Sequence, residues 1–197
     1  MTRKGFLLAM MQPPPAREEE FNAWYDTEHI PERLAVPGFE TARRYVAVEG
    51  WPRYLALYDM ARSDLVATPE YLRVAGANNS PWTRRILACV EGAYRAAGVQ
   101  LFPGEAVTQG ASRALLLRFR GLPAAAEPEL LAGLAASFAG RPETEQYRLL
   151  HATDAGVTDF LAFVELRAPA PTGSLALAAF GESARALDLV NSYAAYR

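Results

Sequence analysis

The stretch FNAWYDTEHIPERLAVPGF, residues 21–39, decides how this chain of 197 residues is interpreted. Three glutamates precede it at positions 18–20, and acidic residues favour the N-terminus of a helix. Pro31 disfavours the helical conformation of the residue before it, so we expect the regular helix to end near His29. Pro37-Gly38 is typical of a turn. The stretch therefore predicts a helix that leads through a turn into a strand.

Outward from this helix, the first half has the order strand, helix, strand, strand, helix, strand. The apolar run 6–11 predicts the first strand, and 39–48 and 54–60 predict two strands joined by a hairpin turn. A second helical stretch is expected at 63–75, and 82–102 is either a helix or a short helix that leads into a strand. This is the order of the split βαβ, ferredoxin-like fold.

The second half repeats this pattern. GFLLAMM from residue 5 aligns with RALLLRF from 113, ETARRY from 40 with ETEQYR from 143, and RYLALYDM from 53 with DFLAFVEL from 159. The three offsets, 108, 103 and 106, agree within the variation that loops allow. We therefore predict an α+β protein in which tandem ferredoxin-like repeats, βαββαβ twice, form an α/β barrel. The expected parts are a first repeat at 1–104, a linker at 105–111 and a second, degenerate repeat at 112–197.

In this arrangement helices cover one face of each sheet, and the other face needs a partner. That partner is the other repeat, the same repeat of a second chain, or both, and the sequence leaves the choice open. A cavity between the two packed faces is the expected place for a small ligand.

Composition excludes several classes of function. Lys and Arg total 20 and Asp and Glu total 22, a net charge of −2 that argues against nucleic-acid binding. The single cysteine, Cys89, excludes a disulfide framework and a cysteine zinc site within one chain. The two histidines, His29 and His151, are too few for a three-histidine metal site. No Gly-rich phosphate loop or nucleophile elbow is found, so we expect no metal and no cofactor.

The N-terminus is basic and then apolar, but its apolar stretch ends at three prolines after Gln12. It is too short for a signal peptide, and no apolar run in the chain approaches the roughly 20 residues of a membrane span. We therefore expect a cytoplasmic protein without a membrane partner.

The candidate catalytic residues are His29, Asp26 and Tyr25. At spacings of three and four residues, all three meet on one face if the segment is helical. A carboxylate beside an imidazole orients it and raises its basicity, and a tyrosine hydroxyl donates a hydrogen bond to a developing enolate. These are the chemical groups that catalyse proton transfer at a carbon next to a carbonyl. In the alternative reading, His29 only complements the helix dipole, and Trp24 and Tyr25 are core residues.

The candidate ligand-binding residues are Trp24, Arg44 and Tyr58. Arg44 is suited to a ligand carboxylate, although a solvent-facing arginine is the favoured alternative. Tyr58 either lines a cavity or packs on a half-buried sheet. Asp59 reaches a ligand or a loop amide, and His151 reads as a half-buried strand histidine rather than a partner of His29.

The motif WYDxxHIP at 24–31, followed by VPGF at 36–39 and RRY at 43–45, resembles the dimeric α/β-barrel superfamily. Within it, the chain is most similar to EthD-like proteins and related families of unassigned activity. The resemblance covers 5–71 well and the second half only through the repeat. It implies the barrel and a homodimer. The superfamily includes muconolactone isomerases, cofactor-independent monooxygenases, aldoxime dehydratases and haem-binding chlorite dismutase-like proteins, so it implies the fold more firmly than the reaction.

Three functions follow as hypotheses. The first is a cofactor-independent isomerase, cyclase or oxygenase that acts on a hydrophobic carbonyl compound with His29 as the base. The second is a non-catalytic protein that binds a small hydrophobic ligand, or an accessory protein. The third is a structural homo-oligomer in which the helix of Trp24 and His29 holds an interface. Haem binding would rest on the resemblance alone.

Overall fold

The computed structural model describes residues 3–154, 156–170 and 172–196. Within these residues, eight strands form a closed barrel in the order β1-β3-β2-β8-β5-β7-β6-β4, and every neighbouring pair is antiparallel. The strands are β1 (Gly5–Gln12), β2 (Phe39–Glu49), β3 (Tyr54–Met60), β4 (Glu91–Phe102), β5 (Arg113–Arg120), β6 (Thr144–Asp154), β7 (Val157–Leu166) and β8 (Leu187–Ala195).

The barrel closes within one chain. The first sheet has the order β4-β1-β3-β2 and the second the order β8-β5-β7-β6, which is the same ferredoxin-like order twice. Their edges join where β2 pairs with β8, from Tyr45 opposite Ala195, and where β4 pairs with β6, from Gly98 opposite Ala152. The predicted tandem α/β barrel is confirmed, and the closure that the sequence left open is intramolecular.

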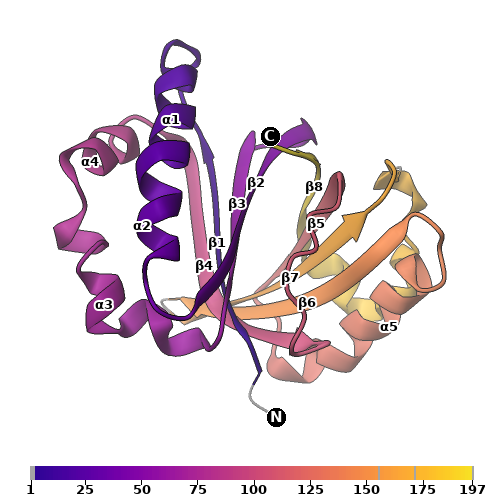
Figure 1. Ribbon diagram of the computed structural model, residues 1–197. Helices are drawn as coiled ribbons and strands as arrows, with labels where there is room; N and C mark the ends of the chain where they lie inside the picture. The colour runs from indigo at the N-terminus through magenta and orange to yellow at the C-terminus, as the bar shows by residue number, and fades with distance from the viewer. Residues whose placement is uncertain (1–2, 155, 171, 197) are drawn as a thin grey trace.

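Helices cover both outer faces of the barrel. In Figure 1, α1 to α4 lie outside the first sheet and α5 lies outside the second. The helices are α1 (Glu18–Trp24), α2 (Ile30–Leu34), α3 (Pro69–Leu72), α4 (Pro81–Leu87) and α5 (Glu127–Phe138). The 3₁₀ segments are η1 (Pro15–Arg17), η3 (Ser63–Ala67), η4 (Gly76–Asn78), η5 (Ala124–Ala126), η6 (Thr172–Ser174) and η7 (Leu177–Ala186). None of these helices is long and apolar enough to cross a membrane.

Side chains fill the interior of the barrel. On β1, Phe6, Leu8 and Met10 point inward while Leu7 and Met11 point outward, because side chains alternate along a strand. The inward residues pack with apolar side chains of the other strands into one buried cluster. An eight-stranded barrel has an interior just wide enough for side chains. A cavity of about 410 Å³ lined by Met10, Tyr94 and Leu189 lies where the two sheets meet, so the expected ligand cavity between the sheets stays a prediction.

The segment 105–111 closes one end of this interior. Arg148 and Asp59 form an almost fully buried ion pair, with 2.6 Å between Nη1 and Oδ1. The amide of Thr108 donates to Asp59 Oδ2 at 2.7 Å, and the next two amides donate to Glu165 Oε1. Of the two roles considered for Asp59, the structure shows the loop amide.

The first helix continues beyond the point at which the sequence predicts its end. Tyr25–His29 forms a π-helical turn, η2, and the chain then continues as α2 to Leu34. The amide of Ile30 donates to the carbonyl of Tyr25, five residues back. Pro31 has no N–H, and in a regular helix its ring would clash with the carbonyl four residues earlier. The wider turn accommodates the proline, so the helix does not end near His29.

Candidate functional site

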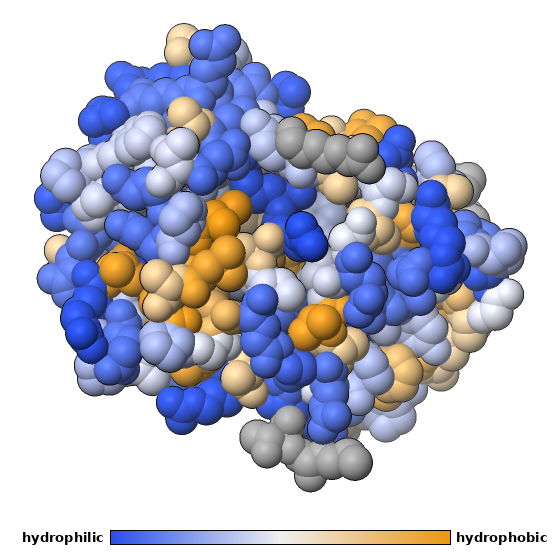
Figure 2. Space-filling model, viewed as in Figure 1, coloured by the Kyte–Doolittle hydropathy of each residue, from blue (hydrophilic) through white to orange (hydrophobic). Residues whose placement is uncertain are grey.

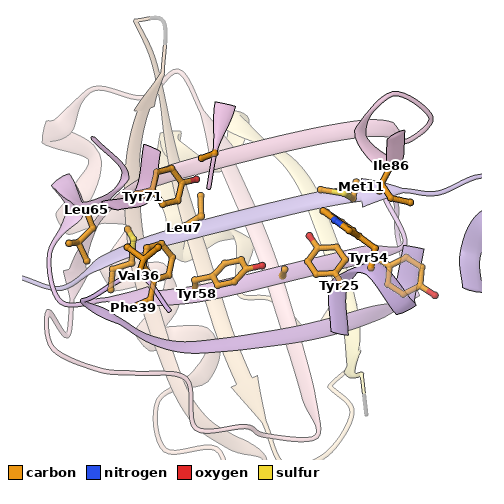
Figure 3. Packing of buried hydrophobic residues seen from close by; sticks show 14 of the residues in the cluster. Leu7, Met11, Tyr25, Val36, Phe39, Tyr54, Tyr58, Leu65, Tyr71 and Ile86 are labelled. Carbon is orange, nitrogen blue, oxygen red and sulfur yellow. The ribbon is translucent and has the colours of Figure 1, made fainter. Parts of the chain in front are cut away.

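A cavity of about 470 Å³ lies between the outer face of the first sheet and the helices that cover it. Most of its lining is apolar, and comes from β1 and from the helical segments. Figure 3 shows Leu7 and Tyr58 side by side on neighbouring strands and Tyr71 facing them. In Figure 2, apolar residues are exposed at the surface between the helical layer and the barrel. This cavity is the candidate site.

The π-helical turn brings Trp24 and His29 together. Residues five apart in a regular α-helix point about 140° away from each other. Across this turn the two rings instead lie against each other, with 4.3 Å between their centroids and an angle of 36° between their planes. Trp24 Nε1 donates to Thr83 Oγ1 on α4 at 3.0 Å, which fixes the indole. Both rings line the cavity, so the turn sets its aromatic wall.

His29 is half-buried at this wall and is held in its neutral form. Burial, and then the nearby guanidinium groups of Arg33 and Arg44, lower the pKa of His29 to about 3. Its Nδ1 atom is buried and has no hydrogen-bond partner among the described residues. The site thus holds a neutral imidazole that no neighbouring carboxylate orients.

Asp26 pairs with Arg44 instead of His29. The Asp26 carboxylate accepts a hydrogen bond from Arg44 Nη1 at 2.7 Å, and in the described part of the chain none links it to His29. The π-helical turn changes the three-residue spacing on which the prediction relied, and a cation is the stronger partner of a carboxylate. Arg44 itself is buried and lies over the rings of Tyr25 and Tyr196, at 4.5 and 4.1 Å. The favoured reading of a solvent-facing Arg44 is wrong, and Arg44 is not among the residues that line the cavity.

Of the two predicted site tyrosines, Tyr58 lines the cavity and Tyr25 does not. Tyr25 is buried behind His29, with 5.2 Å between ring centroids, and does not belong to the described lining. Burial raises its pKa to about 12. Tyr58 does line the cavity, and its buried hydroxyl has no partner among the described residues. Figure 3 shows this hydroxyl turned toward Tyr25. Burial also raises the pKa of Tyr58, so both hydroxyls stay protonated.

Arg33 is a cavity residue that the sequence reasoning missed. It lies on α2 four residues after His29, a spacing that places both on one helical face. Its Nη1 donates to the Val74 carbonyl at 2.7 Å, and its guanidinium lies 5.2 Å from the centre of the Tyr71 ring. Only that spacing could have indicated it. Among the described lining residues there is no Asp or Glu.

The second half has no comparable histidine site. His151 is half-buried on β6, with its ring 4.8 Å from that of Phe160. It is thus a strand histidine, as the sequence indicates. Apolar side chains of α5 and η7 pack directly on the outer face of the second sheet.

No family model and no curated protein matches this chain. Solved structures do. An anthrone oxidase-like protein superposes with a TM-score of 0.70 at 12% identity, over 100% of this chain and 92% of the other. A heme-binding protein from Thermus thermophilus reaches 0.61 at 12% identity, over 100% and 92%. A mutant chlorite dismutase from Candidatus Nitrospira defluvii reaches 0.57 at 10% identity, over 98% and 91%. The chain has the dimeric α/β-barrel fold.

The residues of the cavity do not fit haem. A histidine that ligates a metal almost always donates its second ring N–H to a carboxylate, a carbonyl or water, and this bond fixes the ring. His29 Nδ1 is buried without such a partner in the described residues, and the Trp24 ring lies against the imidazole with 4.3 Å between centroids. The heme-binding protein from Thermus thermophilus therefore shares the fold with this chain without indicating its ligand.

Proposed function

We propose that this protein is a cofactor-independent oxygenase that oxidises an aromatic ketone of the anthrone type with molecular oxygen. One observation carries the proposal. Two buried polar groups that have no hydrogen-bond partner among the described residues, His29 Nδ1 and the Tyr58 hydroxyl, belong to side chains that line the same apolar cavity. Buried polar groups are normally satisfied, so such a pair calls for a ligand or a catalytic role. The likeness to an anthrone oxidase-like structure supports the class of substrate.

An anthrone fits the chemistry of this cavity. It is a flat fused-ring ketone, and apolar and aromatic walls bind such rings. Opposite its carbonyl it carries a CH₂ group that is acidic, because loss of a proton makes the central ring aromatic. The substrate thus offers one proton to a base and one oxygen to a hydrogen-bond donor.

His29 and Tyr58 supply these two functions. The neutral imidazole of His29 takes a proton from the CH₂ group, and the electron pair of that C–H bond moves to the ketone oxygen. The Tyr58 hydroxyl, which stays protonated, donates a hydrogen bond to this enolate oxygen. The imidazolium that forms is then stabilised by the enolate beside it, although burial disfavours a charged His29 in the free protein.

Oxygen is the oxidant. The enolate passes one electron to O₂, and the two radicals combine to form a C–O bond and a peroxide anion. The His29 imidazolium returns its proton to the peroxide. A base then removes the remaining hydrogen of that carbon, the O–O bond breaks, and hydroxide leaves and takes up the proton. One CH₂ group and one O₂ give one C=O group and one water.

The test is oxygen consumption with anthrone, corrected for the uncatalysed rate. His29→Ala should lower kcat by about 10²–10⁴-fold, the usual contribution of a general base. His151→Ala, the matched change at the other histidine, should leave kcat unchanged. Turnover that survives in a folded His29→Ala variant would remove His29 as the base.

A non-catalytic ligand-binding protein is the second candidate. It is favoured by the unpartnered Nδ1 of His29, because a catalytic imidazole usually has a partner that orients it. It predicts that anthrone is bound and recovered unchanged, and that His29→Ala leaves binding nearly intact. Product formation with wild-type protein excludes it.

Several finer statements remain predictions. These are the EthD-like assignment, the repeat bounds 1–104 and 112–197 with the linker 105–111, the cytoplasmic location and the homodimer. Because the barrel closes within one chain, the fold does not require a second copy. The mass in solution tests the homodimer, and a monomer would exclude it.

A further inference from the structure

Three arginines are buried among the described residues, and one of them is paired differently from the other two. Arg148 has the carboxylate of Asp59 at 2.6 Å, and Arg44 has that of Asp26 at 2.7 Å. The carboxylate nearest to Arg33 is Glu32, at 3.9 Å, too far for a hydrogen bond. Arg33 is nevertheless only 3% exposed.

The pairing with Glu32 does not neutralise Arg33 well. Glu32 is an adjacent residue in the helix and is partly exposed. Burial, and then repulsion by Glu28, raise the pKa of Glu32, and these effects exceed the attraction of Arg33. A buried charge without a close partner of opposite sign is costly. The fold therefore retains a buried cation whose charge is poorly balanced.

This cation lines the cavity and has donors to spare. A guanidinium has five N–H donors. In Arg33, Nη1 donates a hydrogen bond to the backbone carbonyl of Val74. Among the described residues, no second hydrogen bond of the Arg33 side chain accompanies this one, so the guanidinium keeps donors for a ligand. Arg33 lines the cavity, and the described lining contains no acidic side chain. The wall thus presents an arginine fork that suits a carboxylate.

We propose that the cavity binds an organic anion, a fused-ring aromatic compound whose carboxylate pairs with Arg33. The proposal rests on the proposed function for the reaction, and names its substrate class as an acid-bearing aromatic ketone. Residues four apart on a helix have Cβ atoms about 5–6 Å from each other. Arg33 and His29 both line the cavity, so one bound molecule can contact both side chains. The sequence assigned a carboxylate to Arg44, and Arg33 takes that role.

The test compares two probes of the same shape by calorimetric titration, anthracenecarboxylate and uncharged anthracenemethanol. Wild-type protein should bind the acid at least about tenfold more tightly than the alcohol, the usual gain from a hydrogen bond to a charged group. Arg33→Met should abolish this preference. Arg33→Lys should keep part of it, since the charge remains but the fork is lost. Arg73→Met, at an exposed arginine paired with Glu70 outside the lining, should keep all of it.

Other results overturn the proposal. Equal binding of both probes by wild type, no binding of the acid, or a preference that survives in Arg33→Met would each do so. Arg33→Met should fold, because replacing a poorly paired buried charge by an apolar side chain is often neutral or stabilising. If Arg33→Met does not fold, the proposal is tested by two other results. Wild type should prefer the acid to the alcohol, and Arg33→Lys should show a smaller preference. Neither probe carries an acidic ring CH₂, so the titration does not depend on whether His29 is a base.

Discussion

The two halves of the barrel share one strand order but use their outer faces differently. In the second half, the 12-residue helix α5 places Leu130, Leu134 and Phe138 on the sheet at regular helical spacing. Gly133 allows η7 to approach so closely that an added Cβ would lie 2.4 Å from the Phe180 ring. The face is filled.

In the first half, the covering layer is broken into short pieces. The π-helical turn interrupts the first helix, and α3 and α4 have four and seven residues. This layer leaves a cavity bordered by Trp24, His29 and Arg33. Both sheets have the same strand order, so the sheet alone does not create the cavity. The helical layer determines whether the outer face of the sheet is packed as hydrophobic core or leaves a ligand cavity.

The largest difference should come from removing the same side chain in both halves. Leu134→Ala opens a hole in a filled face and should cost about 2–5 kcal/mol of unfolding free energy. Leu7→Ala only enlarges an existing cavity, so the leucine loses fewer contacts and the cost should be at least about 1 kcal/mol smaller. Chemical denaturation measures both values. Equal losses would contradict the contrast between the faces.

The next effect is the pH dependence of stability that His29 adds in the first half. The pKa of His29 is lowered to about 3 in the folded protein, against about 6.5 when unfolded. The unfolded chain therefore binds more protons between these values, so His29 contributes stability above pH 6.5 that is lost as the pH falls toward 3. His29→Asn should become less destabilising, relative to wild type, by about 1–3 kcal/mol from pH 7 to pH 4.

Denaturation curves of wild type and His29→Asn at each pH give this difference, in which the titrating carboxylates cancel. The same pair of curves for His151→Asn provides the matched comparison at the other histidine. A difference for His29→Asn that is independent of pH would mean that its imidazole is not held neutral.

Filling the two faces should have opposite outcomes. Gly133→Leu has no room against Phe180 and should cost about 1–3 kcal/mol. Ala75→Leu enters the cavity and should change stability by no more than about 0.5 kcal/mol, while it weakens the binding of anthracenecarboxylate. Thermal unfolding and calorimetric titration check both. A strongly destabilised Ala75→Leu would mean that the cavity is not open to a side chain.

The smallest effect concerns the carboxylate predicted to orient His29. Asp26→Asn keeps an acceptor for Arg44 and should cost about 1 kcal/mol. Because Asp26 pairs with Arg44, kcat of Asp26→Asn with anthrone should stay within about threefold of wild type. It should therefore be far higher than kcat of His29→Ala. A loss as large as that of His29→Ala would restore the predicted Asp26–His29 pair.

Sequence patterns predicted the fold because each strand has a signal within its own stretch of the sequence. A continuous apolar run marks β1, two runs around a hairpin turn mark β2 and β3, and the repeated offsets mark their counterparts. Closure of the barrel depends on pairs such as Tyr45 with Ala195, whose separation in the chain leaves no local signal.

The site was predicted in part, for physical reasons. Trp24, His29 and Tyr58 line the cavity as expected. Pro31 is a reliable sign of disturbed helix, but it does not tell an end from a π-helical turn. The partner of Asp26 is Arg44, 18 residues away on another element, which helical spacing alone does not indicate.

The most direct test of the account is an experimental structure of the protein with anthracenecarboxylate bound. The account predicts the fused rings between the first sheet and its helices, against Trp24 and Tyr58, with the carboxylate on Arg33. Binding inside the barrel, or on the outer face of the second sheet, would contradict it.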